Sequence, residues 1–242
     1  MKQWQPYRAL WNNFPDVFIL KDESIVKQNP EYAASKSGDA ESAASMLKFM
    51  LTPTDIAQIQ QFIENNSCGA EPRLAAVHAY EANLNAIPAA MARTIKERTG
   101  YKYTEAIWQS NIVNHTGADG FSRLARQALF VGKIRTGDTY ILVDDFVGQG
   151  GTLANLRGYI RRHGGYVAAA LVLSGKPFSA KINPTHEQIR QLRKTHGRVL
   201  EKWWQNQFGH SFDYLTQSEA RYLTRSPNAD RIRERIDEAK CL

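Results

Sequence analysis

The chain of 242 residues is long enough for one large domain with a proper hydrophobic core. Hydrophobic residues make up 43% of it and charged residues 23%, which is typical of a globular protein and excludes a low-complexity chain. The two cysteines, Cys68 and Cys241, lie far apart and match no metal-ligand spacing, so neither a disulfide framework nor a zinc site is predicted.

The N-terminus, MKQWQPYRALWNNFPD, lacks the continuous apolar stretch of a secretory signal, and no apolar run reaches membrane-spanning length. We therefore expect a soluble, cytoplasmic protein with no membrane partner. The formal net charge is +7, and the excess of Lys and Arg begins near residue 73. A basic region suits an anionic ligand, either a small phosphate ester or a nucleic acid, and a merely solvated basic surface is the alternative.

Residues 1–72 are predicted to form a helical cap or hood segment. ESAASMLKFM (41–50) is rich in helix formers, and TPTDIAQIQQFIE (52–64) begins with a Thr-Pro-Asp start and continues with isoleucines at helical spacing. At the other end of the chain, residues 177–242 are predicted to form a charged, mostly helical extension. It contains an aromatic cluster with Trp203, Trp204 and Phe208.

Residues 73–176 are predicted to form an α/β core, because short apolar strands alternate there with helices. Such alternation favours a parallel sheet covered by helices on both sides. The expected strands are RLAAVHAY (73–80), YTEAIWQSN (103–111), TYILVDD (139–145) and YVAAALVLSG (166–175), and the expected helices are IPAAMARTIKERTG (87–100) and TLANLRGYIRRHGG (152–165), with a short helix or loop at FSRLARQALF (121–130).

The most informative stretch is YILVDDFVGQGGT, residues 140–152. An unbroken apolar strand runs into Asp144 and Asp145, and a glycine-rich loop then leads into a helix. Glycines let the backbone approach a ligand closely, and the first amides of a helix attract anions. The two carboxylates accept hydrogen bonds from neutral hydroxyls. A sugar phosphate carries both kinds of group, so the stretch predicts a sugar-phosphate site beyond the carboxyl end of this strand.

Two other phosphate loops fit less well. A dinucleotide-binding loop requires a third glycine or alanine where Leu153 stands, and two aspartates before the glycines would repel a pyrophosphate. A P-loop requires a Gly-Lys-Ser/Thr sequence, which does not follow here. An ordinary strand that ends in a turn rich in Asp and Gly is the structural alternative.

YILVDDFVGQGGT resembles the phosphoribosyl pyrophosphate (PRPP) motif of the type I phosphoribosyltransferases, and the resemblance extends over about residues 73–176. It implies that Asp144 and Asp145 bind the ribose hydroxyls and that the following loop binds the 5′-phosphate. That loop is Val147, Gly148, Gln149, Gly150, Gly151 and Thr152. Many members of the family have threonines where this chain has Gly148 and Gln149, so side-chain donors are lost there while the backbone amides remain.

The resemblance also implies three further loops. The pyrophosphate-binding loop corresponds to residues 78–88, where the family's glycines or basic residue are replaced by Asn83 and Asn85. A mobile catalytic loop corresponds to NHTGADGFSRLARQALFVG (114–132), whose candidates for pyrophosphate are His115, Arg123 and Arg126. After the last core strand, Lys176-Pro177 is similar to the Lys-Pro with which some members meet the exocyclic oxygen of a 6-oxopurine.

The implied function is transfer of ribose 5-phosphate from PRPP to a nitrogenous base, with a purine-like acceptor favoured and pyrophosphate released. Mg²⁺ is expected to bind with PRPP and to touch Asp144 or Asp145 only through water, with no direct protein ligand. The acceptor hood could come from residues 1–72, from 177–242, or from both, and a homodimer stays open. The alternative function is a PRPP-responsive or nucleotide-responsive regulator that binds nucleic acid and performs no turnover.

Overall fold

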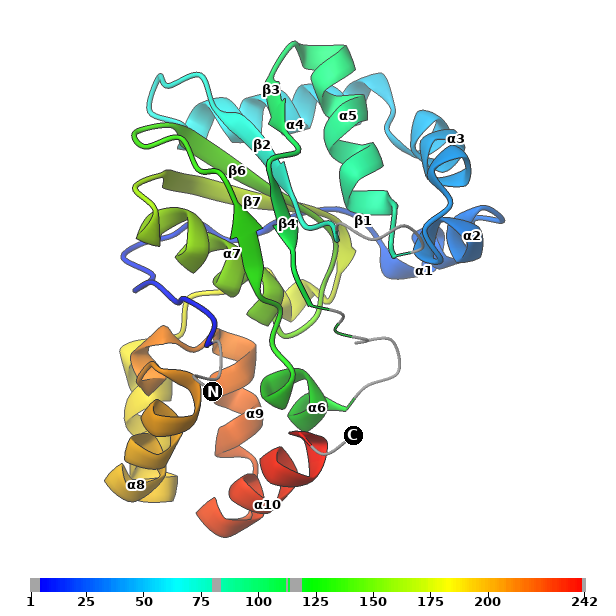
Figure 1. Ribbon diagram of the computed structural model, residues 1–242. Helices are drawn as coiled ribbons and strands as arrows, with labels where there is room; N and C mark the ends of the chain where they lie inside the picture. Colours follow the sequence, from blue (N-terminus) through cyan, green and yellow to red (C-terminus); the bar gives the residue numbers. More distant parts are fainter. Residues whose placement is uncertain (1–4, 80–83, 112, 114–118, 241–242) are drawn as a thin grey trace.

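The centre of the protein is a sheet of five parallel strands in the order β1-β7-β6-β2-β3. The structure is a computed structural model that describes residues 5–79, 84–111, 113 and 119–240 (Figure 1). The strands of the sheet are β1 (Phe18–Lys21), β2 (Arg73–Ala76), β3 (Lys102–Thr104), β6 (Thr139–Val147) and β7 (Tyr166–Gly175). The predicted α/β fold with a parallel sheet is confirmed.

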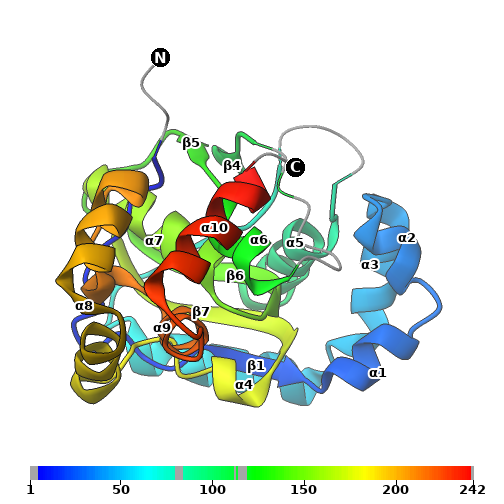
Figure 2. The same ribbon diagram turned by 90° about the horizontal axis from the view of Figure 1, so that it is seen from below.

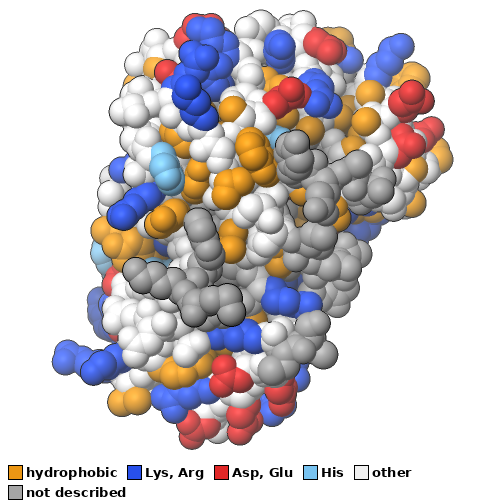
Figure 3. All heavy atoms as spheres, viewed as in Figure 1, with side chains coloured by type: hydrophobic (Ala, Val, Ile, Leu, Met, Phe, Trp, Pro, Cys, Tyr) orange, Lys and Arg blue, Asp and Glu red, His pale blue; other side chains and the backbone are white. Residues whose placement is uncertain are grey.

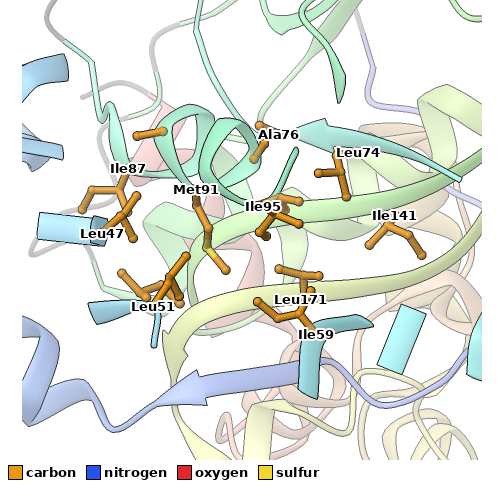
Figure 4. Packing of buried hydrophobic residues seen from close by; sticks show 14 of the residues in the cluster. Leu47, Leu51, Ile59, Leu74, Ala76, Ile87, Met91, Ile95, Ile141 and Leu171 are labelled. Carbon is orange, nitrogen blue, oxygen red and sulfur yellow. The ribbon is translucent and has the colours of Figure 1, made fainter. Parts of the chain in front are cut away.

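Helices cover both faces of this sheet (Figure 1). On one face α3 (Ala40–Met50), α4 (Pro53–Asn66) and α5 (Ile87–Thr99) pack against β2, β6 and β7 in a single hydrophobic cluster (Figure 4). On the other face α7 (Gly151–Arg162) buries Leu153, Leu156 and Ile160 against the same strands. Because β6 is covered on both sides, its apolar run has no exposed face, as the sequence predicted.

The N-terminal segment contributes a strand as well as helices. Its helices α1 (Glu23–Gln28) and α2 (Tyr32–Lys36) follow β1, which pairs with β7 at the edge of the sheet. The sheet therefore extends beyond the predicted core of residues 73–176. The sequence gives little sign of this strand, because FILK has only four residues and all of them are half-buried.

The prediction of one strand over residues 103–111 is wrong. β3 ends at Thr104, and a second strand, β4 (Ile107–Gln109), pairs with β5 (Phe130–Gly132) in a separate two-stranded antiparallel sheet. The chain leaves the main sheet at Ala106, whose carbonyl oxygen accepts a hydrogen bond from the Lys133 N–H at 2.8 Å. A sequence pattern cannot show that change of partner, since residues on both sides are apolar enough for a strand.

The C-terminal extension is helical, as predicted, and has its own hydrophobic cluster. It consists of η1 (Pro177–Ser179), α8 (His186–Phe208), η2 (Phe212–Tyr214), α9 (Gln217–Thr224) and α10 (Ala229–Lys240), and α6 (Gly120–Ala125) from the preceding segment packs with it. Figure 2 shows α10 lying across α6. The described part of the expected mobile loop is thus held by the extension, through an ion pair between Asp119 and Arg235.

Trp204 and Phe208 are buried within this extension. Such a cluster can serve as a base-stacking surface or as a brace against residues 1–72. Neither role applies to these two side chains, because they pack with α6, α9 and α10 and do not line the cleft described below. Aromatic residues at helical spacing form a core here, which is the commoner outcome.

The order of the strands creates a switch point between β2 and β6. From β2 the chain passes through α5 to β3 on one side, whereas from β6 it passes through α7 to β7 on the other side. The two connections cover opposite faces of the sheet. A crevice opens between neighbouring strands at such a point, and it is the usual ligand site of parallel sheets.

No helix in the described part of the chain combines the length and the apolar character needed to cross a membrane.

Candidate functional site

A cleft of about 960 Å³ lies at the switch point. It is lined by Asp144 and Asp145 near the end of β6, by the loop Gly148–Gly150, and by the first residues of α7. Residues that follow β2, among them His78 and Asn85, form the opposite wall. The predicted motif therefore lies in a cavity of the size of small-molecule sites, at the carboxyl ends of two neighbouring strands.

Both carboxylates of the motif are buried, each with 6% exposure. Asp145 is fully engaged: Lys36 Nζ of α2 donates to its Oδ2 at 2.8 Å, and Asn85 Nδ2 donates to its Oδ1 at 2.9 Å. Asp144 accepts a hydrogen bond from the Asp145 backbone N–H at 2.8 Å. The N-terminal segment thus supplies the counter-charge for the motif.

Burial raises the pKa of Asp144 well above its usual value, and the neighbouring Asp145 charge raises it further. Lys36 responds in the opposite sense. Burial alone would lower the pKa of Lys36, but the charge of Asp145 and the hydrogen bond to it outweigh burial and raise that pKa. Lys36 consequently holds its charge more tightly than usual, beside a carboxyl group, Asp144, that holds its proton more tightly than usual.

The glycine loop has the geometry of a close-approach turn. Gly150 has φ +78° and is the N-cap of α7, so the backbone turns in the left-handed region directly before the helix. A Cβ at Gly148 would lie 2.9 Å from Nη1 of Arg123, which places that guanidinium against the loop. The loop thus combines a helix N-terminus with a cation, and both favour a bound anion.

The C-terminal extension holds the loop from outside. Ser179 Oγ donates to the Gly148 carbonyl oxygen, and Thr216 Oγ1 donates to the Gln149 carbonyl oxygen at 2.5 Å. A Cβ at Gly151 would lie 2.7 Å from Oε1 of Glu219, so the start of α7 and the start of α9 are in close contact. A side chain at 151 would therefore have to displace the Glu219 carboxylate.

Glu219 does not leave an unpaired charge beside the loop. Its carboxylate accepts hydrogen bonds from both Nη1 and Nη2 of Arg8, each at 2.9 Å. Both side chains are almost completely buried. Burial would raise the pKa of Glu219, but Arg8 outweighs burial and lowers that pKa. Arg8 also donates to Asn155 Oδ1 of α7 at 2.5 Å. Arg8 thus links the N-terminal segment to α7 and to the C-terminal extension next to the glycine loop.

The other predicted residues are placed as follows. Lys176 lines the cleft and forms an ion pair with Glu23 of α1 at 2.5 Å, while Thr152 and Gln149 line it near the glycine loop. Val147 has its side chain in the hydrophobic core, and Arg126, at the end of α6, is not among the lining residues. The binding roles predicted for these two residues stay predictions. Asn83 and His115 lie outside the described residues.

Two groups of residues that line the cleft were not predicted from the sequence. His78 follows β2, and its Nδ1–H donates to the Ala76 carbonyl oxygen at 3.2 Å, while burial lowers its pKa and so keeps it neutral near pH 7. The second group comes from the C-terminal extension and includes Phe178, Arg221 and Arg225. His78 stood within a predicted loop and could have been found, but nothing local in the sequence connects α9 with the cleft.

Comparison with known proteins gives relatives by sequence. No protein-family model matches the chain. Protein TraN of Escherichia coli is 36% identical over 234 residues, which cover 96% of this chain and 51% of TraN. An uncharacterized protein of Haemophilus influenzae is 33% identical over 158 residues, which cover 64% of this chain and 34% of that protein. The chain spans about half the length of TraN and about a third of the other relative.

Solved structures with a similar course of the chain include several phosphoribosyltransferases. The adenine phosphoribosyltransferase of Thermoanaerobacter pseudethanolicus gives a TM-score of 0.38 at 15% identity, over 57% of this chain and 73% of that one. The hypoxanthine-guanine phosphoribosyltransferase of Bacillus anthracis gives 0.34 at 18% identity, over 61% and 76%. Because these values are low, the assignment of the fold rests on the order and direction of the strands.

Proposed function

We propose that the protein binds PRPP in the cleft and transfers its ribose 5-phosphate group to a nitrogenous base. The observation that carries the proposal is the meeting of two buried aspartates, a glycine loop and the N-terminus of α7 at the switch point of the sheet. A ligand that has vicinal hydroxyls and a phosphate fits this combination. The resemblance of residues 140–152 to the PRPP motif supports the same ligand.

In the proposed complex the amides and the hydroxyl of residues 149–152 hold the 5′-phosphate. Arg123, which lies against Gly148, adds positive charge. Asp144 and Asp145 accept hydrogen bonds from the ribose hydroxyls, and this fixes the sugar so that its C1 atom faces the acceptor. The nitrogen nucleophile forms a bond to C1 while the C1–O bond to pyrophosphate breaks, and the electron pair of that bond leaves with the pyrophosphate.

The cleft also fits the divalent cation that would accompany PRPP. Two buried carboxylates lie side by side, and Lys36 pairs with one of them, Asp145. A hard cation that keeps most of its waters suits such oxygen donors. Mg²⁺ would neutralise charge on the leaving pyrophosphate, while Asp144 would contact it through water.

A second candidate function is binding of PRPP without turnover, as in a ligand-responsive regulator. One observation favours it: both oxygens of Asp145 already have partners, Lys36 and Asn85. To bind Asp145, the ribose hydroxyls must share its oxygens with Lys36 and Asn85 or displace these two donors. This competition weakens PRPP binding, which a regulator tolerates. The name of the relative TraN indicates neither function.

The test is a screen of nucleobases for PRPP-dependent release of pyrophosphate in the presence of Mg²⁺, with PRPP affinity measured by calorimetry. We expect release with at least one purine-like base. In the double variant Asp144→Asn/Asp145→Asn, PRPP affinity should fall by several kcal/mol, because each charge-assisted hydrogen bond is worth roughly 1.5–3 kcal/mol.

Three outcomes are distinct. PRPP binding with no release for any base, with or without a phosphate group on it, would favour the regulator. Unchanged PRPP affinity in a folded double variant would remove the two aspartates from the sugar site. No PRPP binding by the unaltered protein would overturn both candidate functions.

A further inference from the structure

The cleft has two halves on either side of β6. β2 flanks β6 on one side and β7 flanks it on the other. His78 and Asn85 belong to the β2 half, whereas Lys176 and Phe178 follow β7 and belong to the other half. Helix α9 of the C-terminal extension completes the β7 half with Arg221, and Arg225 at the C-cap of this helix lines it too.

The proposed reaction assigns different ligands to the two halves. A nucleophile that displaces pyrophosphate at C1 attacks from the side opposite to the leaving group, as far as the sugar allows. The loop after β2, where the resemblance places pyrophosphate, lies in the β2 half. The acceptor therefore enters through the β7 half, between Phe178 and α9.

Arg221 and Arg225 give this half an uncompensated positive charge. Elsewhere in the cleft Lys36 pairs with Asp145, and Lys27 and Lys176 both pair with Glu23. Within the part of the chain that the structure describes, no carboxylate forms an ion pair with Arg221 or Arg225. Two like charges four residues apart on a helix repel each other, so an anion bound between them would relieve an unfavourable contact.

An aromatic ring lies beside these arginines. The Arg221 guanidinium lies 4.3 Å from the centre of the Phe178 ring, and Phe178 is still 52% exposed. Arg221 Nη2 also donates to Ser218 Oγ at 3.3 Å, which orients the guanidinium. An oriented, planar guanidinium binds phosphate oxygens in pairs, and an exposed ring offers a face to a planar base.

The outer surface of the extension differs from this half of the cleft. Figure 3 shows Lys and Arg mixed with Asp and Glu on the lower part of the molecule. On α10, arginines pair with acidic residues three positions away, as in Arg231 with Glu234. That face is suited to solvent, whereas a nucleic-acid surface would continue the positive charge. The observations favour a small anionic ligand in the cleft.

We propose that Arg221 and Arg225, with Phe178, form an anion subsite that selects an acceptor carrying a phosphate group on a base or nucleoside. The inference rests on the proposed function and deepens it. The cleft of about 960 Å³ is at the upper end of small-molecule sites, which leaves room for a nucleotide-sized acceptor beside PRPP. A neutral base alone would leave both arginines without a partner.

The experiment measures binding to protein saturated with PRPP and Mg²⁺, so that the glycine loop is occupied. The two probes are adenosine and adenosine 3′-monophosphate, which differ only in the phosphate; their N9 is already substituted. We expect the phosphorylated probe to bind about tenfold more tightly by calorimetry. In Arg221→Gln/Arg225→Gln this ratio should fall to about one, with the PRPP affinity unchanged.

The matched control is Arg190→Gln/Lys194→Gln, which removes the same charge at the same spacing from the exposed side of α8. It should keep the preference for the phosphorylated probe. A ratio near one in the unaltered protein, or a ratio that persists in the cleft variant, would overturn the subsite while PRPP binding stands. If the two probes bind equally and an oligothymidylate binds tightly in an Arg221-dependent way, the arginines bind nucleic acid. This result would also overturn the proposed subsite. Absence of PRPP binding overturns the proposed function and the subsite together.

Discussion

Asp144 is the residue at which the proposed ligand binding and stability oppose each other. Its raised pKa means that the folded protein favours the protonated form. The contribution of this group to the free energy of unfolding is therefore complete below the pKa of an unfolded aspartate, and it is lost as the pH rises through the higher folded value. Above the pKa of an unfolded aspartate, the burial of Asp144 therefore costs stability, as at many ligand sites.

We predict that Asp144→Asn raises the free energy of unfolding at pH 7 by about 0.5–2 kcal/mol, because the neutral amide removes the repulsion from Asp145 and keeps an oxygen for the Asp145 N–H. The same variant should bind PRPP more weakly. Chemical denaturation at pH 4 and pH 7 measures the first effect, and the gain should be larger at pH 7. A variant less stable than the unaltered protein at pH 7 contradicts this account.

Lys36 is predicted to be the main counter-charge of the motif. Lys36→Met leaves Asp145 with Asn85 alone in a buried site, so the free energy of unfolding should fall by roughly 1–3 kcal/mol. Lys27→Met is the matched control, because it breaks an exposed pair with Glu23 and should change stability by about 0–1 kcal/mol. Equal losses in the two variants would show that Lys36 has no special role. Urea denaturation gives both values.

At the scale of the element, the glycine loop and α7 act as one unit. We predict that Gly150→Ala and Gly137→Ala both lower stability by about 1 kcal/mol or somewhat more, because each glycine has a positive φ, +78° and +83°. Only Gly150→Ala should also weaken PRPP binding. A Cβ there meets Ile182 at 3.1 Å and crowds the loop, whereas a Cβ at Gly137 meets nothing within 4 Å.

Calorimetry with PRPP separates the two alanine variants. If both bind PRPP as the unaltered protein does, the phosphate lies away from Gly150. If both lose affinity, the effect is a general loss of stability.

The elements that the sequence predicted well are those specified by local patterns. β6, α7 and β7 follow one another with an apolar run, a glycine loop and a Gly-Gly end. α5 ends at Gly100, the last residue of the predicted helix, and this glycine lies in the left-handed region. β1 and the split at Ala106 were missed because each depends on a partner far along the chain. The ion pair of Lys36 with Asp145, 109 residues apart, is beyond local patterns for the same reason.

At the scale of the whole molecule, the C-terminal extension behaves as a second core attached to the sheet. Trp204 is completely buried in it, and Phe208 lies 4.2 Å away, ring centre to ring centre. We predict that Trp204→Ala lowers the free energy of unfolding by about 3–5 kcal/mol. Val199→Ala on the exposed side of α8 should cost less than about 0.5 kcal/mol.

Kinetics tests the placement of this core away from the cleft. The folded molecules of the Trp204→Ala variant should have the same KM for the acceptor as the unaltered protein. A raised KM at an unchanged melting temperature would mean that Trp204 contacts the acceptor after all.

The network of Arg8, Asn155 and Glu219 has a consequence for the order in which the protein forms. Arg8 bonds to Asn155 across 147 residues and to Glu219 across 211 residues. Contacts between residues so far apart form late in folding, because the chain loses the entropy of closing a long loop before these contacts stabilise it. During synthesis the glycine loop lacks the contacts of Thr216 and Glu219 until the start of α9 has left the ribosome. The ability to hold a phosphate should therefore arise in the last stage of folding, and a nascent chain that ends before residue 219 should hold none.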